Sequence, residues 1–210
     1  MKFHLVTLFQ EACDAYLSAS IIGRARKEKK ISVSYQTPRD FVDNKWGKVD
    51  ERPYGGGPGM VMTALPVVKA VEKALGGETP KSLGGLAAKS KKGKKGKKAV
   101  IWFSPGGKQF TNKDADALRK FENVVLICGR YEGIDERAKK MLKALGTVKE
   151  FAVGEAVYTG GEVPALAIVD AVTRRIPGVL GKDASVEERR VASRAVYTRP
   201  EVISYKKKNY

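Results

Sequence analysis

The chain has very few of the side chains that metal sites and nucleophilic enzymes use. It contains one histidine and two cysteines among 210 residues. Cys13 and Cys128 form no CxxC pair, so their spacing predicts no metal site and favours a reducing compartment. The single histidine, His4, lies inside an apolar run. We expect His4 to pack in the core or at its edge rather than to act in a Ser-His-Asp triad or a Cys-His catalytic pair.

Long hydrophobic runs are also absent. No apolar stretch approaches the roughly 18 residues needed to cross a bilayer, and residues 1–9 are too short and too mixed for a signal peptide. The chain has no G-x-x-x-x-G-K-[ST] phosphate loop and no G-x-G-x-x-G after a strand, which argues against nucleoside triphosphate hydrolysis and ordinary Rossmann binding. We therefore expect a soluble, cytoplasmic protein with no membrane partner.

Acidic residues are far fewer than basic ones. The chain has 23 Asp and Glu against 40 Lys and Arg, a formal net charge of +17. Ten lysines fall in residues 89–98 and 206–208, so the rest of the chain carries only seven of the excess charges. The first tract ends a low-complexity insertion, residues 77–98. It suits a polyanion such as nucleic acid, although a solvated, solubilising loop explains it equally well.

Hydrophobic patterning predicts an α/β fold. Five largely apolar runs are typical of strands in a parallel sheet that is covered on both faces. They are residues 3–9, 31–35, 99–103, 124–128 and 148–153. Helical patterns alternate with them, at residues 11–29, 64–75, 112–121, 134–145 and 164–175. The alternation predicts one domain, residues 1–176, with a mostly parallel sheet and helices on both faces.

Three glycine-bearing loops each follow a predicted strand. They are residues 104–107, 129–133 and 154–161. In open α/β sheets ligands bind beyond the carboxyl ends of the strands, where glycine lets the backbone come close to the ligand. The loops are ordinary turns on the alternative interpretation, but three of them together favour a ligand site. A fourth cluster, residues 52–60, places Arg52 and Tyr54 beside several glycines, where they can hold a phosphate and stack on a base.

Four motifs together closely resemble a known family. They are Arg52-Pro-Tyr-Gly-Gly-Gly-Pro-Gly-Met60, Cys128-Gly-Arg-Tyr-Glu-Gly-Ile-Asp-Glu-Arg137, Thr159-Gly-Gly-Glu-Val-Pro-Ala165 and Ile176-Pro-Gly-Val-Leu-Gly181. The sequence resembles the TrmD-type tRNA (guanine-N1)-methyltransferases of the SPOUT superfamily, collinearly from Met1 to about Val202. The resemblance implies a C-terminal trefoil knot, a homodimer with its active sites at the interface, and S-adenosylmethionine as methyl donor. It also implies tRNA as the partner, with methylation at N1 of the guanosine immediately 3′ of the anticodon, and suggests a requirement for Mg²⁺.

The resemblance also implies the site residues. The S-adenosylmethionine loops would comprise Trp102, Phe103, Ser104, Pro105, Gly129, Tyr131, Glu132, Gly133, Val153, Gly154, Glu155, Ala156, Val157, Tyr158, Gly160 and Gly161. Glu155 and Ala156 depart from the family pattern, which has aspartate and tyrosine there. A tyrosine side-chain contact at position 156 would be lost, and Tyr158 could offset it. The RNA-binding residues would be Arg52, Tyr54, Gly57 and Gly59.

The catalytic residues implied by the resemblance are Arg174 and Glu188. Arg174 falls where the family has an arginine that steadies negative charge on the guanine O6, although a helix-terminal arginine can also simply serve the helix dipole. Arg189 falls where the family has an aspartate as general base, and arginine cannot accept a proton. Glu188, or Glu187, could substitute in this loop, which is about four residues shorter than is usual in the family.

The resemblance divides the C-terminal part of the chain as well. Residues 177–196 correspond to an interdomain loop, and residues 197–210 to the beginning of a helical tRNA-binding domain that the sequence does not continue into. We expect the lysine tract to replace part of its RNA contacts. Two alternatives stay open from the sequence: a knotted S-adenosylmethionine- or RNA-binding protein that has lost catalysis, and a SPOUT enzyme acting on another RNA.

Overall fold

The chain folds into an α/β sandwich with a short hairpin near its C-terminus. The computed structural model describes residues 1–76, 96–180 and 197–210. The strands are β1 (Lys2–Val6), β2 (Ser32–Gln36), β3 (Asp50–Glu51), β4 (Val61–Met62), β5 (Lys98–Gln109), β6 (Asn123–Ile127), β7 (Thr147–Ala152), β8 (Ser204–Tyr205) and β9 (Lys208–Asn209). The helices are α1 (Gln10–Leu17), α2 (Ser20–Lys27), α3 (Ala64–Ala74), α4 (Asn112–Leu118), α5 (Arg137–Leu142) and α6 (Glu162–Thr173), with a 3-10 turn η1 at Pro38–Phe41.

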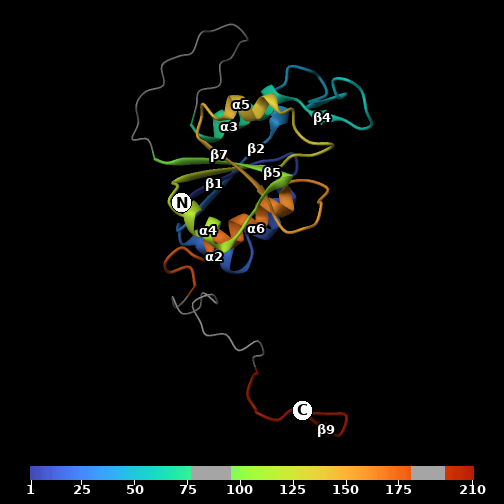
Figure 1. Ribbon diagram of the computed structural model, residues 1–210. Helices are drawn as coiled ribbons and strands as arrows, with labels where there is room; N and C mark the ends of the chain where they lie inside the picture. The colour runs from blue at the N-terminus through green and yellow to red at the C-terminus, as the bar shows by residue number, and fades with distance from the viewer. Residues whose placement is uncertain (77–95, 181–196) are drawn as a thin grey trace.

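Five strands form one parallel sheet, in the order β2-β1-β6-β5-β7. They are the five strands that the apolar runs predict. Since parallel strands share a direction, all their carboxyl ends lie along one edge of the sheet (Figure 1). The chain crosses from β6 to β7 past the intervening β5, so the loops that follow β6 and β7 must reach across β5 to meet.

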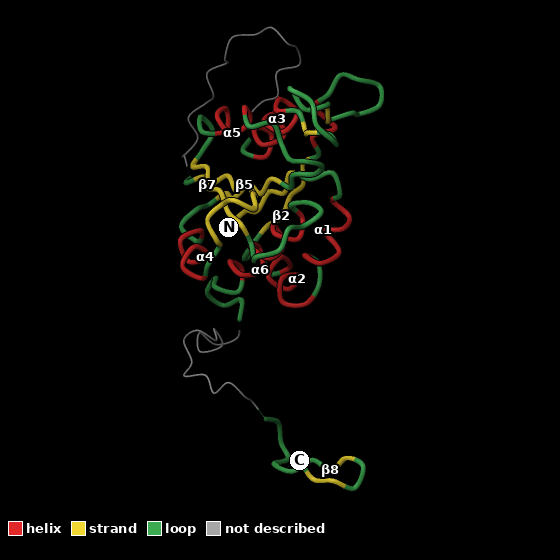
Figure 2. Tube along the Cα trace, turned by 45° about the vertical axis from the view of Figure 1, so that its right-hand side comes forward, coloured by secondary structure: helices red, strands yellow, loops and turns green. Residues whose placement is uncertain are grey.

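Helices cover both faces of the sheet, as the continuous apolar strands predict (Figure 2). On one face α1, α2, α4 and α6 pack around a core that includes Phe3, Leu5, Ile101 and Leu126. On the other face α3 and α5 pack against alternate residues of the same strands, among them Val100 and Trp102. The mostly parallel α/β class that the sequence predicts is therefore confirmed.

The predicted helix at residues 11–29 is wrong in one respect: it is two helices, α1 and α2. Ser20 takes a φ of 48°, a left-handed value that a continuous helix cannot contain. The break lets both helices turn their apolar sides into the same core. The buried apolar residues are Cys13 and Leu17 on α1 and Ile22 and Ala25 on α2.

The interpretation of residues 104–107 as a loop is also wrong. The strand β5 runs on through them, with an irregular register between Phe103 and Lys108 where it pairs with β7. A Cβ on Gly107 would lie 2.8 Å from the carbonyl carbon of Phe151, so glycine is needed there for the two strands to approach. These residues form a bulge beside the start of the 153–161 loop.

A capping box begins α4. Thr111 caps the helix through the amide of Asp114, and the Asp114 carboxylate accepts from the Thr111 amide in return. The described residues contain no helix long and apolar enough to cross a membrane.

Candidate active site

Two loops far apart in sequence meet at the carboxyl edge of the sheet. The Gly161 amide donates to the Gly129 carbonyl oxygen at 2.9 Å. A Cβ on Gly161 would lie 2.6 Å from the Cα of Cys128 and 2.9 Å from the Gly129 nitrogen, so no other residue fits without moving the backbone. The structure thus confirms that the 129–133 loop and the 153–161 loop come together, as the sequence predicts.

The second of these loops forms an exposed arch. Residues 154–159 are all exposed, with the Val157 side chain 79% accessible. One end is fixed by Gln109, whose Nε2 donates to the Gly154 carbonyl oxygen at 2.8 Å. Gly154 has a φ of 74°, a left-handed value that favours glycine and turns the chain away from β7. The arch therefore offers backbone groups and the side chains of Val157 and Tyr158 to a ligand.

The third component is the early glycine cluster, residues 52–60, which docks on the 129–133 loop. The Glu132 amide donates to the Met60 carbonyl oxygen at 3.0 Å, and the Met62 amide donates to the Gly133 carbonyl oxygen at 2.9 Å. Tyr131, between them, has a φ of 59°, a rare value for a residue with a side chain and one that clusters at functional sites. Its side chain is half exposed.

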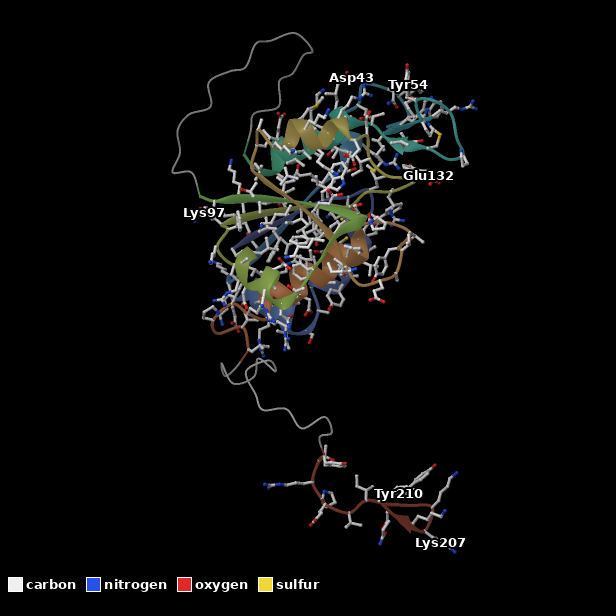
Figure 3. All side chains as sticks on the ribbon, viewed as in Figure 1. Asp43, Tyr54, Lys97, Glu132, Lys207 and Tyr210 are labelled. Atoms are coloured by element: carbon white, nitrogen blue, oxygen red, sulfur yellow. The ribbon has the colours of Figure 1, made fainter. Side chains whose placement is uncertain are left out.

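The glycine cluster presents its side chains outward. Tyr54 is fully exposed, and Gly55, Gly56 and Gly57 have no atoms within 4 Å of where a Cβ would stand. Gly59 is different, because a Cβ there would lie 2.6 Å from the Cγ of Glu132. In Figure 3 Tyr54 points away from the body of the molecule while Glu132 lies beneath this lobe. The lobe is thus tethered at Gly59 and Met60, and its tip is open to a partner.

A buried carboxylate lies under the two joined loops. Glu162, the first residue of α6, is 5% exposed. Its Oε1 accepts from Thr7 Oγ1 at 2.8 Å, and its Oε2 pairs with Arg130 Nε at 3.0 Å. The sequence does not single out Thr7, and it shows Arg130 only as part of the 128–137 motif. The contacts with Glu162 join residues that are far apart in the chain, and only the order of the strands brings them together.

Comparison with known proteins agrees with this arrangement. A sequence model described as tRNA (Guanine-1)-methyltransferase TrmD matches residues 1–208. A protein of Photobacterium profundum named tRNA (guanine-N(1)-)-methyltransferase is 39% identical over 203 residues, which are 95% of this chain and 74% of the relative. Relatives of the same name from Janthinobacterium sp. and Mannheimia succiniciproducens are each 41% identical, over 96% and 97% of this chain and 76% and 73% of their own.

The chain belongs to the TrmD family. The family is one of methyltransferases, and the assembled loops are the candidate active site. The motifs that carry the resemblance in the sequence, residues 52–60, 128–137 and 159–165, are the same segments that the hydrogen bonds and close glycine contacts join.

The β5 residues that were expected to contact the cofactor differ in how far they are buried. Trp102 is 4% exposed and lies under the Lys139 ammonium, which is 5.0 Å from its ring centre. Its side chain is therefore part of the core, and only its backbone can face a cofactor. Phe103 and Ser104 are half-buried, and Pro105 is exposed at the bulge. Ser104 Oγ accepts from the Gly106 amide at 3.3 Å, which shapes the bulge.

Of the two expected catalytic residues, one is described. Arg174 directly follows α6 and is half-buried. Glu188, together with Glu187 and Arg189, lies outside the described residues, as does most of the lysine tract. Lys97 and Lys98 are the described lysines of the tract. Lys98 Nζ donates to the Leu75 carbonyl oxygen, and Figure 3 shows Lys97 and Glu132 at opposite ends of the sheet.

His4 has a structural role, as the sequence predicts. Its ring nitrogens pair with Ser34 Oγ at 2.7 Å and Asn123 Oδ1 at 3.1 Å. Burial lowers the pKa of His4, and the hydrogen bond with Asn123 offsets part of that effect.

The thiols of Cys13 and Cys128 are both buried and lie side by side. Hydrogen bonding with Cys13, and then burial, raise the pKa of Cys128.

The glycine loops of the site suit a ligand that is held by backbone groups. Gly160 and Gly161 leave no room for a Cβ, and Gly154 and Gly133 have left-handed φ values, so the loops present backbone rather than side chains. Such loops can hold an adenosine by its edges. Within residues 1–76, 96–180 and 197–210 no three His, Cys, Asp or Glu side chains form a group that could hold a metal ion.

Proposed function

We propose that this chain transfers the methyl group of S-adenosylmethionine to N1 of the guanosine immediately 3′ of the anticodon in tRNA. The observation that carries the proposal is the meeting of three family motifs at one edge of the sheet. The Gly161 amide joins the 153–161 loop to Gly129, and the Met60 carbonyl joins the glycine cluster to Glu132. The names of the family and of its curated relatives support tRNA guanine-N1 as the target.

The 129–133 loop, the 153–161 loop and the β5 bulge would hold the cofactor. When bound, S-adenosylmethionine supplies a positively charged sulfonium and an already activated methyl group. The chain must then hold the adenosine by backbone groups and align the acceptor nitrogen with the methyl. The carboxylates of Glu132 and Glu155 are exposed on these loops and give the region a negative charge that suits a sulfonium.

The guanosine side of the reaction would use the glycine cluster and the end of α6. Arg52 and Tyr54 are exposed on the cluster and can hold a phosphate and stack on an unpaired base. Arg174 would donate to the guanine O6, where negative charge develops once N1 loses its proton. Glu188 would take that proton, since Arg189, at the expected position of the base, cannot.

Three finer features of the proposal come from the resemblance. The knotted topology is supported by the crossover from β6 past β5 to β7 and by the return of the 153–161 loop to Gly129 beneath β6. A homodimer with active sites at the interface is supported by exposed apolar side chains, Val157 and Val163 in and after the 153–161 loop and Tyr16 and Ile21 on α1 and α2. A cytoplasmic location is supported by two free, buried cysteines.

We also propose three functional parts. Residues 1–176 would form the methyltransferase domain, residues 177–196 the interdomain loop that carries Glu188, and residues 197–210 the beginning of a tRNA-binding part. The chain covers 73–77% of the length of the curated relatives that it matches. The lysines of residues 89–98 would add contacts with RNA phosphates.

The test combines purified protein, labelled S-adenosylmethionine, and tRNA transcripts with and without a guanosine 3′ of the anticodon. Label transfer to the first transcript alone supports the proposal. Cofactor binding without transfer to any tRNA supports the alternative of a binding protein that has lost catalysis, which Arg189 motivates. Transfer to other RNA alone supports the second alternative, a SPOUT enzyme with another substrate.

A further inference from the structure

The Glu162 carboxylate joins three segments that all end at the active-site edge. Thr7, directly after β1, donates to Oε1 at 2.8 Å, and Arg130, in the loop after β6, pairs with Oε2 at 3.0 Å. Glu162 itself follows the 153–161 loop. The side chain of Glu162 is 7% exposed and that of Arg130 is 26% exposed, so little solvent screens this pair.

The Arg130 guanidinium is held on its other sides as well. It stacks over the Phe9 ring, 4.3 Å from the ring centre, and its Nη1 lies 3.5 Å from the Thr159 carbonyl oxygen. The Phe9 amide donates to Thr7 Oγ1 at 3.0 Å, so the residues that follow β1 hold both partners of the ion pair. Arg130 thus spans the gap between the two cofactor loops, with a fixed end on each.

Gly160 leaves the space that this contact needs. A Cβ at Gly160 would lie 2.5 Å from Arg130 Nε and 2.6 Å from Glu162 Oε2. Position 160 therefore requires glycine, because the Arg130 and Glu162 side chains pack against its backbone. The 153–161 loop could not take this path beside the ion pair with a larger residue at position 160.

We propose that Glu162 is a positioning residue, which through Arg130 and Thr7 sets the spacing of the two S-adenosylmethionine loops. This inference rests on the proposed function of those loops. A buried ion pair gives little net stability compared with an apolar pair of the same size, because removing two charges from water is costly. The hydrogen bonds from Thr7 to Glu162 and from Arg130 to the Thr159 carbonyl oxygen, together with the close contact of the two charges, fix the geometry of the loops. A cofactor bound by backbone groups depends on that geometry.

The experiment compares Glu162→Gln with the unmodified chain by calorimetric titration with S-adenosylmethionine and by thermal unfolding. Glutamine keeps the shape and can still accept from Thr7, but it has no charge to hold Arg130. We expect the Kd for S-adenosylmethionine to rise about tenfold or more at a temperature where both proteins are fully folded. Asp170→Asn is the matched control, since Asp170 lies on the same helix and accepts from the Tyr16 hydroxyl at an exposed site. It should leave the Kd unchanged.

A second variant separates positioning from stability. Arg130→Met combined with Glu162→Gln removes both charges, so it should recover much of the Tm that Glu162→Gln loses. A positioning role predicts that the Kd nonetheless stays high. Recovery of the Kd together with the Tm would show a purely structural role and overturn the inference. Should Glu162→Gln fail to fold, Thr7→Val against Thr7→Ser gives the same test, because serine retains the hydroxyl donor and should retain the affinity.

The proposed function and this inference fail in different ways. If the unmodified, folded chain does not bind S-adenosylmethionine, the proposed function fails. If it binds the cofactor and folded Glu162→Gln binds it equally well, the proposed function stands and the positioning role of Glu162 is refuted.

Discussion

The amide of Gly161 lies 2.9 Å from the carbonyl oxygen of Gly129, and there is no room for a side chain at Gly161. This one contact closes the gap between the loops that follow β6 and β7, although β5 lies between those strands in the sheet. The site forms because the chain, after β7 has paired at the edge of the sheet, returns to the residues that follow β6.

Gly161→Ala should open this contact. The added methyl group would lie 2.6 Å from the Cα of Cys128, which is backbone and cannot rotate away. We expect a loss of about 1–3 kcal/mol in the free energy of unfolding and at least a tenfold weaker binding of S-adenosylmethionine. Urea unfolding and calorimetric titration measure the two effects. Met141→Ala is the control, because Met141 is exposed on α5 and lies outside the proposed cofactor loops; an equal effect there would contradict the prediction.

Tyr54→Ala should weaken tRNA binding alone. The Tyr54 side chain is fully exposed on the glycine cluster, so its loss removes no packing, while one stacked base contributes about 1–3 kcal/mol to binding. Filter binding should show about a tenfold rise in the Kd for tRNA, with the Kd for S-adenosylmethionine and the Tm unchanged. Met141→Ala, which truncates an exposed side chain on α5, should change none of the three. Unaltered tRNA affinity in Tyr54→Ala would remove Tyr54 from the RNA surface.

Arg174→Ala should slow methyl transfer without loosening the cofactor. A guanidinium that stabilises charge building on the guanine O6 acts mainly in the transition state, so kcat should fall about 100-fold while the Kd for S-adenosylmethionine stays near normal. Single-turnover rates with saturating tRNA are the measurement. Lys143→Ala, at an exposed position after α5, controls for the lost positive charge. A rate equal to that of the unmodified chain would leave Arg174 with only the helix-terminal role.

The lysine tract should add a salt-dependent contribution to tRNA binding. Replacing its seven lysines with glutamine should weaken tRNA binding and reduce the slope of log Kd against log salt, because fewer counterions are released. Lys97, the described end of the tract, lies at the opposite end of the sheet from Glu132. The methyl-transfer rate at saturating tRNA should therefore not change. An unchanged affinity and an unchanged slope would show that the tract is only a solvated loop.

His4 should make the fold sensitive to mild acid. Burial lowers the pKa of His4 in the folded state below its ordinary value of 6.5. As the pH falls through about 6.5, the unfolded chain takes up a proton that the folded chain resists, so stability is present above that pH and is lost below it. Urea unfolding at pH about 7.5 and about 5.5 should show a smaller loss for His4→Gln than for the unmodified chain. Equal losses of unfolding free energy in the two proteins would contradict this prediction, because the loss would then come from carboxylates and not from His4.

Much of the fold follows from local patterning, and part of it does not. The inner strands β1, β5 and β6 are predictable because each contains a continuously apolar run that is buried. The edge strands β2 and β7 are less apolar and only partly buried. The break between α1 and α2 is not, since it depends on a left-handed φ at Ser20, a residue type that does not require one. The bulge at 104–107 looks like a loop because its glycines resemble a turn, whereas they allow β5 to pass close to β7.

Part of the candidate site can likewise be predicted from the sequence, and part of it cannot. The glycine loops are predictable because glycines after apolar strands indicate close backbone approach. The structure brings the loops at 129–133 and 154–161 together and places Gly59 and Met60 against the first of them. The contact of Thr7 with Glu162 joins residues 155 positions apart. No local pattern reports such a contact, because it depends on β1 lying beside β6 and on the path of the chain after β7.

The most direct test of the central claim locates the methyl group on the RNA. The protein is incubated with S-adenosylmethionine and a tRNA transcript that has guanosine 3′ of the anticodon, and the product is read by nuclease digestion with mass spectrometry and by reverse transcription. We expect 1-methylguanosine and a new stop at that nucleotide, because a methyl on N1 blocks base pairing. A folded protein that binds both ligands and yields no 1-methylguanosine, or yields it at another position, would refute the proposed function.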